Sequence, residues 1–146
     1  MLLTGTYPRT LDDKKRLVMP RRVRDELGEV KKLYVTPGLD QCLWVYTEKG
    51  LEQLAQKLDQ VPATDAEARI FRRLFFAQME AVDLDRTGRI LVPERLMGHA
   101  GMQHEVVILG VQDHLELWDA VKWKEYAAAH SPRFDAIAEG AFRNRS

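Results

Sequence analysis

A segment that occurs twice constrains the fold of this chain more than any other feature. Residues 11–20 read Leu-Asp-Asp-Lys-Lys-Arg-Leu-Val-Met-Pro, and residues 84–93 read Leu-Asp-Arg-Thr-Gly-Arg-Ile-Leu-Val-Pro. The shared aspartate, arginine and proline recur at a constant offset of 73 residues. A period of this length, present only twice, indicates a duplicated small domain and not a solenoid array. We therefore expect two copies of one unit that together form an internal pseudo-dimer.

The similarity continues beyond the repeated segment, with one residue deleted in the second copy. The matching positions are apolar or aromatic: Leu43, Val45, Tyr46, Leu51 and Leu54 correspond to Leu115, Leu117, Trp118, Trp123 and Tyr126. A match over this length indicates that a whole structural unit was duplicated, and not the short motif alone.

Composition places the chain among ordinary globular proteins, since 45% of its 146 residues are hydrophobic and 30% are charged. This length suits one compact domain or two half-size domains that share a core. No apolar run approaches the ~18 residues that span a bilayer, and no signal-peptide pattern opens the sequence. Cys42 is the single cysteine, which excludes an internal disulfide and favours a buried thiol in a reducing compartment. We therefore predict a cytoplasmic protein without a membrane partner.

Each copy is expected to form a strand, a turn, a second strand, a short helix, two further strands and a final helix. The expected strands are residues 6–11, 16–19, 33–36 and 42–46 in the first copy and 106–109 and 115–118 in the second. Asp and Gly favour the turn inside each repeated segment. Gly88 suits a positive φ in this turn, whereas Lys15 at the matching position costs more in that conformation.

Prolines and glycines set the expected ends of the short helices. Pro20 and Pro93 suit a first helical turn, and the helices that they begin should end at Gly28 and Gly98.

The second half of each copy carries its own turn and helix signals. Gly38 and Gly110 are expected to turn the chain between two strands. Thr47 and Asp119 then suit the N-caps of amphipathic helices.

A helical connection of residues 59–81 is expected to join the copies. Thr64-Asp-Ala-Glu67 has the form of a capping box, and apolar residues recur after it at helical spacing. Ser131, which precedes Pro132, is expected to cap a further helix in the C-terminal tail.

These elements predict a mixed α+β fold that is rich in strands. Since the helices alone could not give each copy a core of its own, we expect the copies to be fused through their strands into a small β-barrel decorated by helices. The expected units are residues 5–49 and 78–121, with connecting helices at 50–77 and a helical tail at 122–146.

The doubled Asp-x-x-x-Arg motif, with its flanking residues, resembles the MraZ family. The similarity covers nearly the whole chain, from the initial Met-Leu-Leu-Thr-Gly to the strands that carry Trp44 and Trp118. The resemblance implies two swapped-hairpin units of the SpoVT/AbrB type, fused into a pseudo-two-fold barrel. The first motif of the family usually reads Asp-x-Lys-Gly-Arg. Lys15 replaces the glycine here, which leaves open the geometry of this turn and whether Lys15 adds a DNA contact.

The resemblance also implies a function. It implies a bacterial, cytoplasmic, nucleoid-associated and sequence-specific transcription regulator that assembles into a homo-oligomeric ring. Such a regulator binds tandem short repeats in double-stranded DNA upstream of the division and cell-wall gene cluster, including its own gene.

The residues of the motif have structural as well as functional interpretations. Asp12 and Asp85 suit turns in which the carboxylate accepts hydrogen bonds from nearby backbone amides, and we interpret both as structural. Arg16 and Arg89 either pair with carboxylates or contact DNA, because the arginine fork suits carboxylate, phosphate and the edge of guanine.

The cationic residues are distributed unevenly, although the net charge is zero. Residues 1–24 hold seven cationic and two anionic side chains, whereas residues 82–98 hold three of each. Such residues usually form a solvated surface, but this cluster in a neutral chain favours phosphate contact. The predicted DNA-binding residues are Arg9, Lys14, Lys15, Arg16, Arg21, Arg22, Arg86 and Arg89. From the difference in charge we expect the first copy to contact DNA and the second mainly to support it.

We predict that the protein is not an enzyme. Two symmetry-related aspartates could share a proton as in aspartic proteases, but an arginine four residues after each would hold the carboxylate ionised. The histidines lack paired metal-ligand spacing, and the sequence has no glycine-rich phosphate loop. We therefore expect no metal, no cofactor and no small-molecule substrate.

Apolar side chains on the expected helices suit either a core or a subunit interface. The candidates for the interface are Ile70, Phe71, Leu74, Phe75, Met79, Trp123 and Tyr126. The alternative function is therefore a ring-forming protein-interaction scaffold without specific DNA binding, although a scaffold has no need of the basic residues at 1–24.

Overall fold

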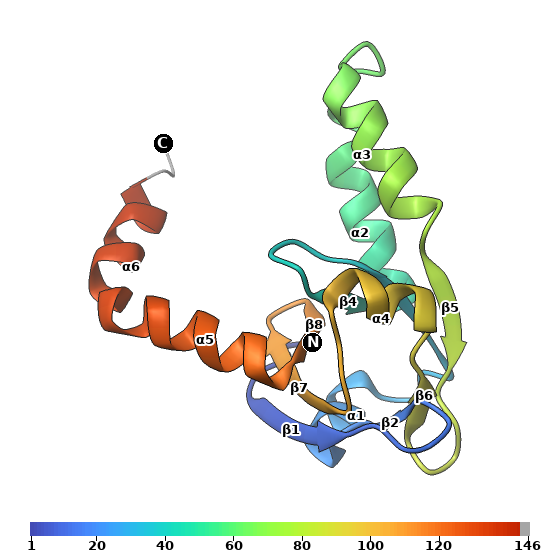
Figure 1. Cartoon of the computed structure of the whole chain (residues 1–146). Helices are drawn as coiled ribbons and strands as arrows, with labels where there is room; N and C mark the ends of the chain where they lie inside the picture. The colour runs from blue at the N-terminus through green and yellow to red at the C-terminus, as the bar shows by residue number, and fades with distance from the viewer. Residues whose placement is uncertain (144–146) are drawn as a thin grey trace.

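The computed structural model describes residues 1–143, which form two antiparallel sheets with helices around them (Figure 1). The strands are β1 (Thr6–Thr10), β2 (Arg16–Val18), β3 (Lys32–Pro37), β4 (Leu43–Tyr46), β5 (Glu80–Asp83), β6 (Arg89–Leu91), β7 (Glu105–Val111) and β8 (His114–Asp119). The helices are α1 (Arg21–Leu27), α2 (Glu48–Leu58), α3 (Ala66–Phe76), α4 (Glu94–Ala100), α5 (Ala120–His130) and α6 (Phe134–Arg143), with a 3₁₀ turn η1 (Ser131–Arg133). The predicted mixed α+β class is confirmed. Helices α2, α3, α5 and α6 extend well beyond the sheets.

The strands of the two copies are interleaved. The larger sheet has the order β1-β7-β8-β4-β3-β5, and β2 pairs with β6 in a separate two-stranded ribbon. Strand β1 of the first copy therefore pairs with β7 of the second, and β5 of the second copy pairs with β3 of the first. The expected fusion of the copies through their strands is thus confirmed. The larger sheet ends at β1 and β5 without closing, so the expected barrel is not confirmed.

The register of the strands follows the sequence duplication. In the β2–β6 ribbon, Leu17 lies opposite Ile90, its own equivalent at the offset of 73. In the larger sheet, Trp44 lies opposite Glu116, its equivalent after the one-residue deletion. When a residue pairs with its own repeat equivalent, the two-fold axis passes between the two residues. A pseudo-two-fold axis therefore passes through the middle of both pairs.

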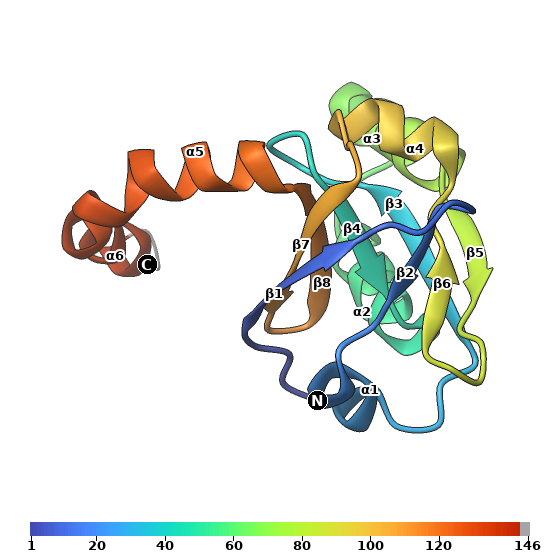
Figure 2. The same ribbon diagram turned by 60° about the horizontal axis from the view of Figure 1, so that its bottom comes forward.

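The main core lies between the ribbon and the larger sheet, and Figure 2 shows β2 and β6 crossing the sheet. Leu17 and Ile90 point inward from the ribbon and are fully buried against the sheet residues Leu33, Ile108 and Leu117. Alternation along each short strand makes this possible, since successive side chains point to opposite faces. The inward face of the ribbon therefore closes the core, and its other face is left to solvent.

The strands that carry the tryptophans are joined by a half-buried carboxylate. Glu116 accepts hydrogen bonds from the indole nitrogens of Trp44 (3.1 Å) and Trp118 (2.9 Å). Cys42 is buried beside Trp118 as a free thiol, and burial raises the pKa of that thiol well above its usual range. The predicted buried cysteine is confirmed.

Two glycines, Gly98 and Gly110, do not have the roles that the sequence predicted. Helix α4 continues through Gly98 to Ala100, and Gly101 ends it with a left-handed φ of 61°. Gly110 lies inside β7, where an added Cβ would come within 2.4 Å of the Thr4 backbone. This glycine allows the N-terminal segment to approach the sheet and does not turn the chain.

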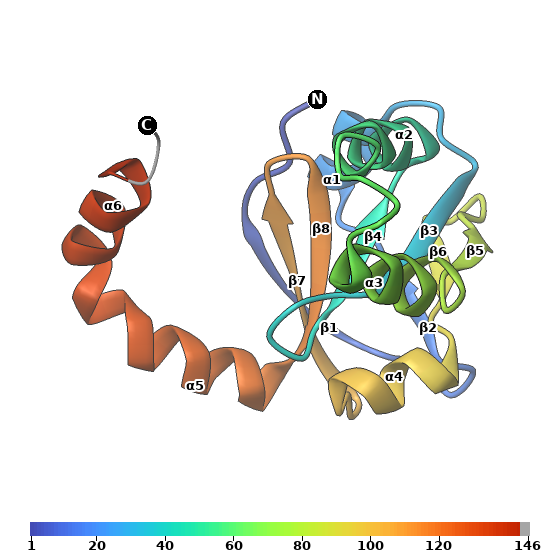
Figure 3. The same cartoon turned by 90° about the horizontal axis from the view of Figure 1, so that it is seen from above.

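Helices α2 and α3 form a hairpin on one side of the sheet (Figures 1 and 3). Thr47 caps α2 as predicted, accepting from the Gly50 amide at 3.0 Å. The cap of α3 is Asp65 and not Thr64, since the Asp65 carboxylate accepts from the Ala68 amide. Aspartate and threonine are both good caps, and the sequence pattern does not separate neighbours of this kind.

The C-terminal helices extend away from the sheets as an arm (Figure 1). Asp119 caps α5 as predicted, whereas Ser131 makes no capping hydrogen bond and begins the η1 turn that leads into α6. Phe134, Ile137 and Phe142 are exposed on α6. Residues 144–146 of the expected tail lie outside the described part of the chain. Within residues 1–143, no helix combines the length and the apolar character that membrane crossing requires.

Candidate nucleic-acid interface

The turn between β1 and β2 is held by Asp12. Its carboxylate accepts hydrogen bonds from the backbone amides of Lys14 (2.9 Å) and Arg16 (2.8 Å) and from Nε of Arg16 (2.8 Å). The backbone hydrogen bond from Arg16 is the main reason that the pKa of Asp12 lies below its usual value. The ionised carboxylate thus fixes both the turn and the direction of the Arg16 side chain.

The turn between β5 and β6 repeats this arrangement. Asp85 accepts from the backbone amides of Thr87 and Arg89, each at 2.9 Å, and from Nε of Arg89 at 3.2 Å. These bonds, led by the Arg89 amide, lower the pKa of Asp85 to about 2. Both aspartates thus accept hydrogen bonds from backbone amides of their own turns. Each carboxylate pairs with the arginine of its own turn, so the two do not form a proton-sharing dyad.

The two turns share a left-handed backbone position that different residues occupy. Lys15 has a left-handed φ of 63°, and Gly88 occupies the matching position with a φ of 80°. The turn therefore keeps its conformation in the first copy although the glycine is absent.

Exchanging the residues at these two positions should change stability in opposite directions. Lys15→Gly should raise the free energy of unfolding by about 0.5–1 kcal/mol, because relief of a strained φ outweighs the added freedom of the unfolded chain. Gly88→Lys should lower it by at least ~1 kcal/mol, since its Cβ would also lie 2.6 Å from Nε of Arg24. Urea denaturation of the two variants measures both changes. A loss of stability in Lys15→Gly would show that the relief of strain is smaller than the freedom that glycine adds to the unfolded chain.

The turns lie at opposite ends of the β2–β6 ribbon and on the same side of the molecule (Figures 2 and 3). The backbone links them to the ribbon, since the carbonyl of Gly88 accepts from the Met19 amide at 2.7 Å and that of Lys15 accepts from the Val92 amide at 2.9 Å. The ribbon and its turns thus form one continuous surface.

The second-copy turn lies next to helix α1 of the first copy. Helix α1 follows β2 and reaches the second-copy turn, where Arg24 donates to the carbonyl oxygen of Arg86 at 3.5 Å. Of the cations in residues 1–24, Lys14, Lys15 and Arg16 therefore lie at one end of the ribbon and Arg24 lies at the other. Both ends of the ribbon thus carry cations from residues 1–24, and the dominance of the first copy in DNA contact stays a prediction.

The side chains of Arg16 and Arg89 remain available for a ligand. Each is 32% exposed, and each uses Nε for the bond to its aspartate. Among the described residues, the terminal nitrogens of these two guanidinium groups have no hydrogen-bond partner. The aspartates thus orient the arginines without occupying their terminal donors.

Comparison with known proteins identifies the family. The family model described as "MraZ protein, putative antitoxin-like" matches the chain twice, over residues 2–74 and 75–145. The chain belongs to the MraZ family. The two matches agree with the duplication, since each contains one of the two Asp-x-x-x-Arg turns.

Relatives that match over nearly their whole length carry the same family name. A "Transcriptional regulator MraZ" from Moorella thermoacetica is 44% identical over 94% of this chain and 95% of its own length. Proteins of that name from Finegoldia magna and Heliobacterium modesticaldum are 38% and 39% identical, over 95% and 94% of this chain and 96% and 95% of their own lengths.

Some predicted DNA-binding residues of this MraZ chain lie apart from the two turns. Arg9 lies on β1 and donates to the Pro8 carbonyl, and Arg22 lines a small hollow beside the N-terminal segment. Arg21 is exposed at the start of α1. The structure brings together Lys14, Lys15 and Arg16 at one end of the ribbon, and Arg86 and Arg89 at the other. Arg24 joins this second group, which the sequence did not indicate because the contact crosses between copies.

The candidate interface residues of this MraZ chain divide into buried and exposed ones. Phe75 is buried, and Phe71 and Met79 pack against it, whereas Ile70 and Leu74 are exposed on α3. Trp123 and Tyr126 are half-buried on α5, with ring centroids 5.3 and 4.9 Å from that of Trp118. Exposed apolar side chains on α3 and on α6 are thus available to contact a second molecule.

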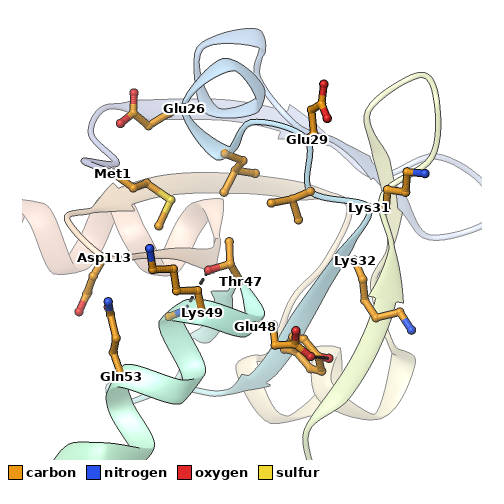
Figure 4. A pocket seen from close by; sticks show the side chains of 14 residues that line it. Met1, Glu26, Glu29, Lys31, Lys32, Thr47, Glu48, Lys49, Gln53 and Asp113 are labelled. Carbon is orange, nitrogen blue, oxygen red and sulfur yellow. Dashed lines mark hydrogen bonds between the residues drawn. The ribbon is translucent and has the colours of Figure 1, made fainter.

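A separate hollow lies on another part of the surface. It has a volume of about 790 Å³ and is bordered by α1, β3 and the start of α2 (Figure 4). Its rim carries both signs of charge, including Glu26, Glu29, Lys32 and Lys49, so the polar groups do not converge on one ligand chemistry. In residues 1–143, no cluster of His, Cys, Asp and Glu could hold a metal ion. The Asp-x-x-x-Arg ribbon is therefore the best candidate for the functional site.

Proposed function

We propose that this MraZ protein is a sequence-specific transcription regulator that binds double-stranded DNA through the β2–β6 ribbon and its two turns. The observation that supports this most is the pair of turns on one side of the molecule, each with an arginine oriented by an aspartate. A two-stranded ribbon fits the major groove of DNA, which is ≈ 12 Å wide. The names of the relatives, which are transcriptional regulators, agree with this proposal.

The proposal includes the DNA target and the form of the protein that binds it. We propose that several protomers assemble, as a closed ring, and bind tandem short repeats upstream of the division and cell-wall gene cluster, including the gene for this protein. The protein would then be nucleoid-associated in the cytoplasm, with its copies arranged as swapped-hairpin units of a pseudo-two-fold barrel. Exposed apolar residues on α3 and α6 are the candidate contacts between protomers.

Salt dependence of binding tests this proposal. If each protomer neutralises ~3 phosphates, the slope of log affinity against log salt should be about −2.7 per bound protomer. Fluorescence anisotropy with a duplex from upstream of the gene for this protein, at several salt concentrations, measures the slope. A slope near zero would favour the scaffold without specific DNA binding.

A further inference from the structure

The outward face of the ribbon carries two exposed aliphatic side chains. Val18 is 44% exposed and Leu91 is 55% exposed, and the two are equivalent at the offset of 73 residues. Their neighbours Leu17 and Ile90 point the other way and fill the core. The core does not require an aliphatic residue at either exposed position, since polar residues usually occupy the solvent face of such a ribbon.

These aliphatic residues lie next to the two oriented arginines. Val18 is opposite Arg89 in the ribbon, and Leu91 is opposite Arg16. On the outward face, these four side chains thus form the corners of a rectangle. Cationic and aliphatic corners alternate around it. Its sides measure roughly 7 Å along a strand and about 5 Å between strands, which is small enough to enter a major groove.

We propose that Val18 and Leu91 contact the 5-methyl groups of thymines in the major groove. This inference rests on the proposed function and adds what the ribbon recognises. The thymine methyl is the apolar group that the base edges present in the major groove, and apolar side chains are suited to contact it. The arginines on either side supply donors for phosphate or guanine. Because the pseudo-two-fold axis of the ribbon passes between Val18 and Leu91, the two side chains face opposite strands of the duplex.

The test compares two forms of one DNA fragment. The fragment from upstream of the gene for this protein is prepared with thymine or with uracil, which lacks the methyl group and keeps every hydrogen-bonding group. The wild-type protein should bind uracil DNA about 4-fold more weakly for each methyl contact that it loses, which follows from the burial of one methyl group. The loss should be roughly 15-fold when both contacts of a protomer are lost.

Variants connect this loss to the two residues. The double variant Val18→Ala with Leu91→Ala should bind thymine DNA more weakly than wild type and should show little further loss on uracil DNA. Leu39→Ala is the matched control, because Leu39 is an exposed aliphatic residue in the loop between β3 and β4. It should keep both the affinity and the sensitivity to uracil. Thermal denaturation confirms that each variant is folded.

The outcomes separate this inference from the proposed function. If wild type binds both DNAs equally well with the expected salt slope, the proposed function stands and the methyl contact is wrong. If the double variant stays as sensitive to uracil as wild type, the sensitivity comes from DNA deformability and the inference is also wrong. If wild type binds neither DNA, both proposals fail.

Discussion

Arg16→Ala and Arg89→Ala should each lower specific DNA affinity by about 5- to 150-fold, since one well-placed arginine contact to a base contributes ~1–3 kcal/mol. The structure predicts losses of similar size because both arginines occupy equivalent positions on the ribbon, each held by an aspartate. Fluorescence anisotropy with the upstream duplex measures both affinities at one salt concentration.

Conservative and remote substitutions complete this experiment. Arg16→Lys should recover only part of the loss, because lysine keeps the charge and loses the planar fork. Arg73→Ala removes an exposed cation on α3, which Figure 1 shows apart from the ribbon, and should leave affinity nearly unchanged. Full affinity in Arg89→Ala, together with a large loss in Arg16→Ala, would contradict the prediction of similar losses and support dominance of the first copy.

Preventing assembly should lower the affinity for DNA with several repeats more than any other change. A single protomer offers few phosphate contacts, so it should bind weakly. Linked protomers turn each later contact into an intramolecular event, and affinity can then rise by ~10²–10⁴ without new contacts. Leu74→Glu and Phe134→Glu place a charge at exposed apolar positions on α3 and α6, where neither substitution disturbs the core.

The measurement compares DNA with one repeat and DNA with several. Light scattering first identifies which variant is a folded monomer. Wild type should gain steeply in affinity with the number of repeats, and the monomeric variant should gain little. Equal affinities of the two proteins for the multi-repeat DNA would show that assembly does not supply the affinity.

The sequence predicts the local parts of this structure well. The Asp-x-x-x-Arg turns, the N-caps Thr47 and Asp119 and the glycine end of α1 depend on residues a few positions apart. The same is true of the aspartate hydrogen bonds, which join residues two and four positions apart. A motif that contains both partners of an interaction can be interpreted without knowledge of the fold.

Contacts between the copies are what the sequence does not show. Glycine is common in turns, yet Gly110 lies in a strand, where the absence of a side chain lets the Thr4 backbone pack against it. Arg24 belongs to a basic segment, yet it lies against the turn that contains Arg86. In both cases the partner lies in the other copy, and spacing along the chain carries no information about it.

Exposed aliphatic residues on a strand are also difficult to recognise from the sequence. Val18 and Leu91 look like ordinary core positions of short strands, and only their exposure distinguishes them from Leu17 and Ile90. Their equivalence across the repeat is a signal that could have indicated them, because both copies have an aliphatic residue at this position.

Because both copies lie in one chain, the two ends of the ribbon can carry different residues. A dimer of identical chains must present the same side chains at both ends, so it suits inverted half-sites. Here one end carries Lys14 and Lys15, and the other carries Arg86 and Thr87. A ribbon with unlike ends distinguishes the two orientations of an asymmetric site. Several such protomers would therefore align in the same sense along DNA, which is the arrangement that direct repeats require and inverted repeats do not.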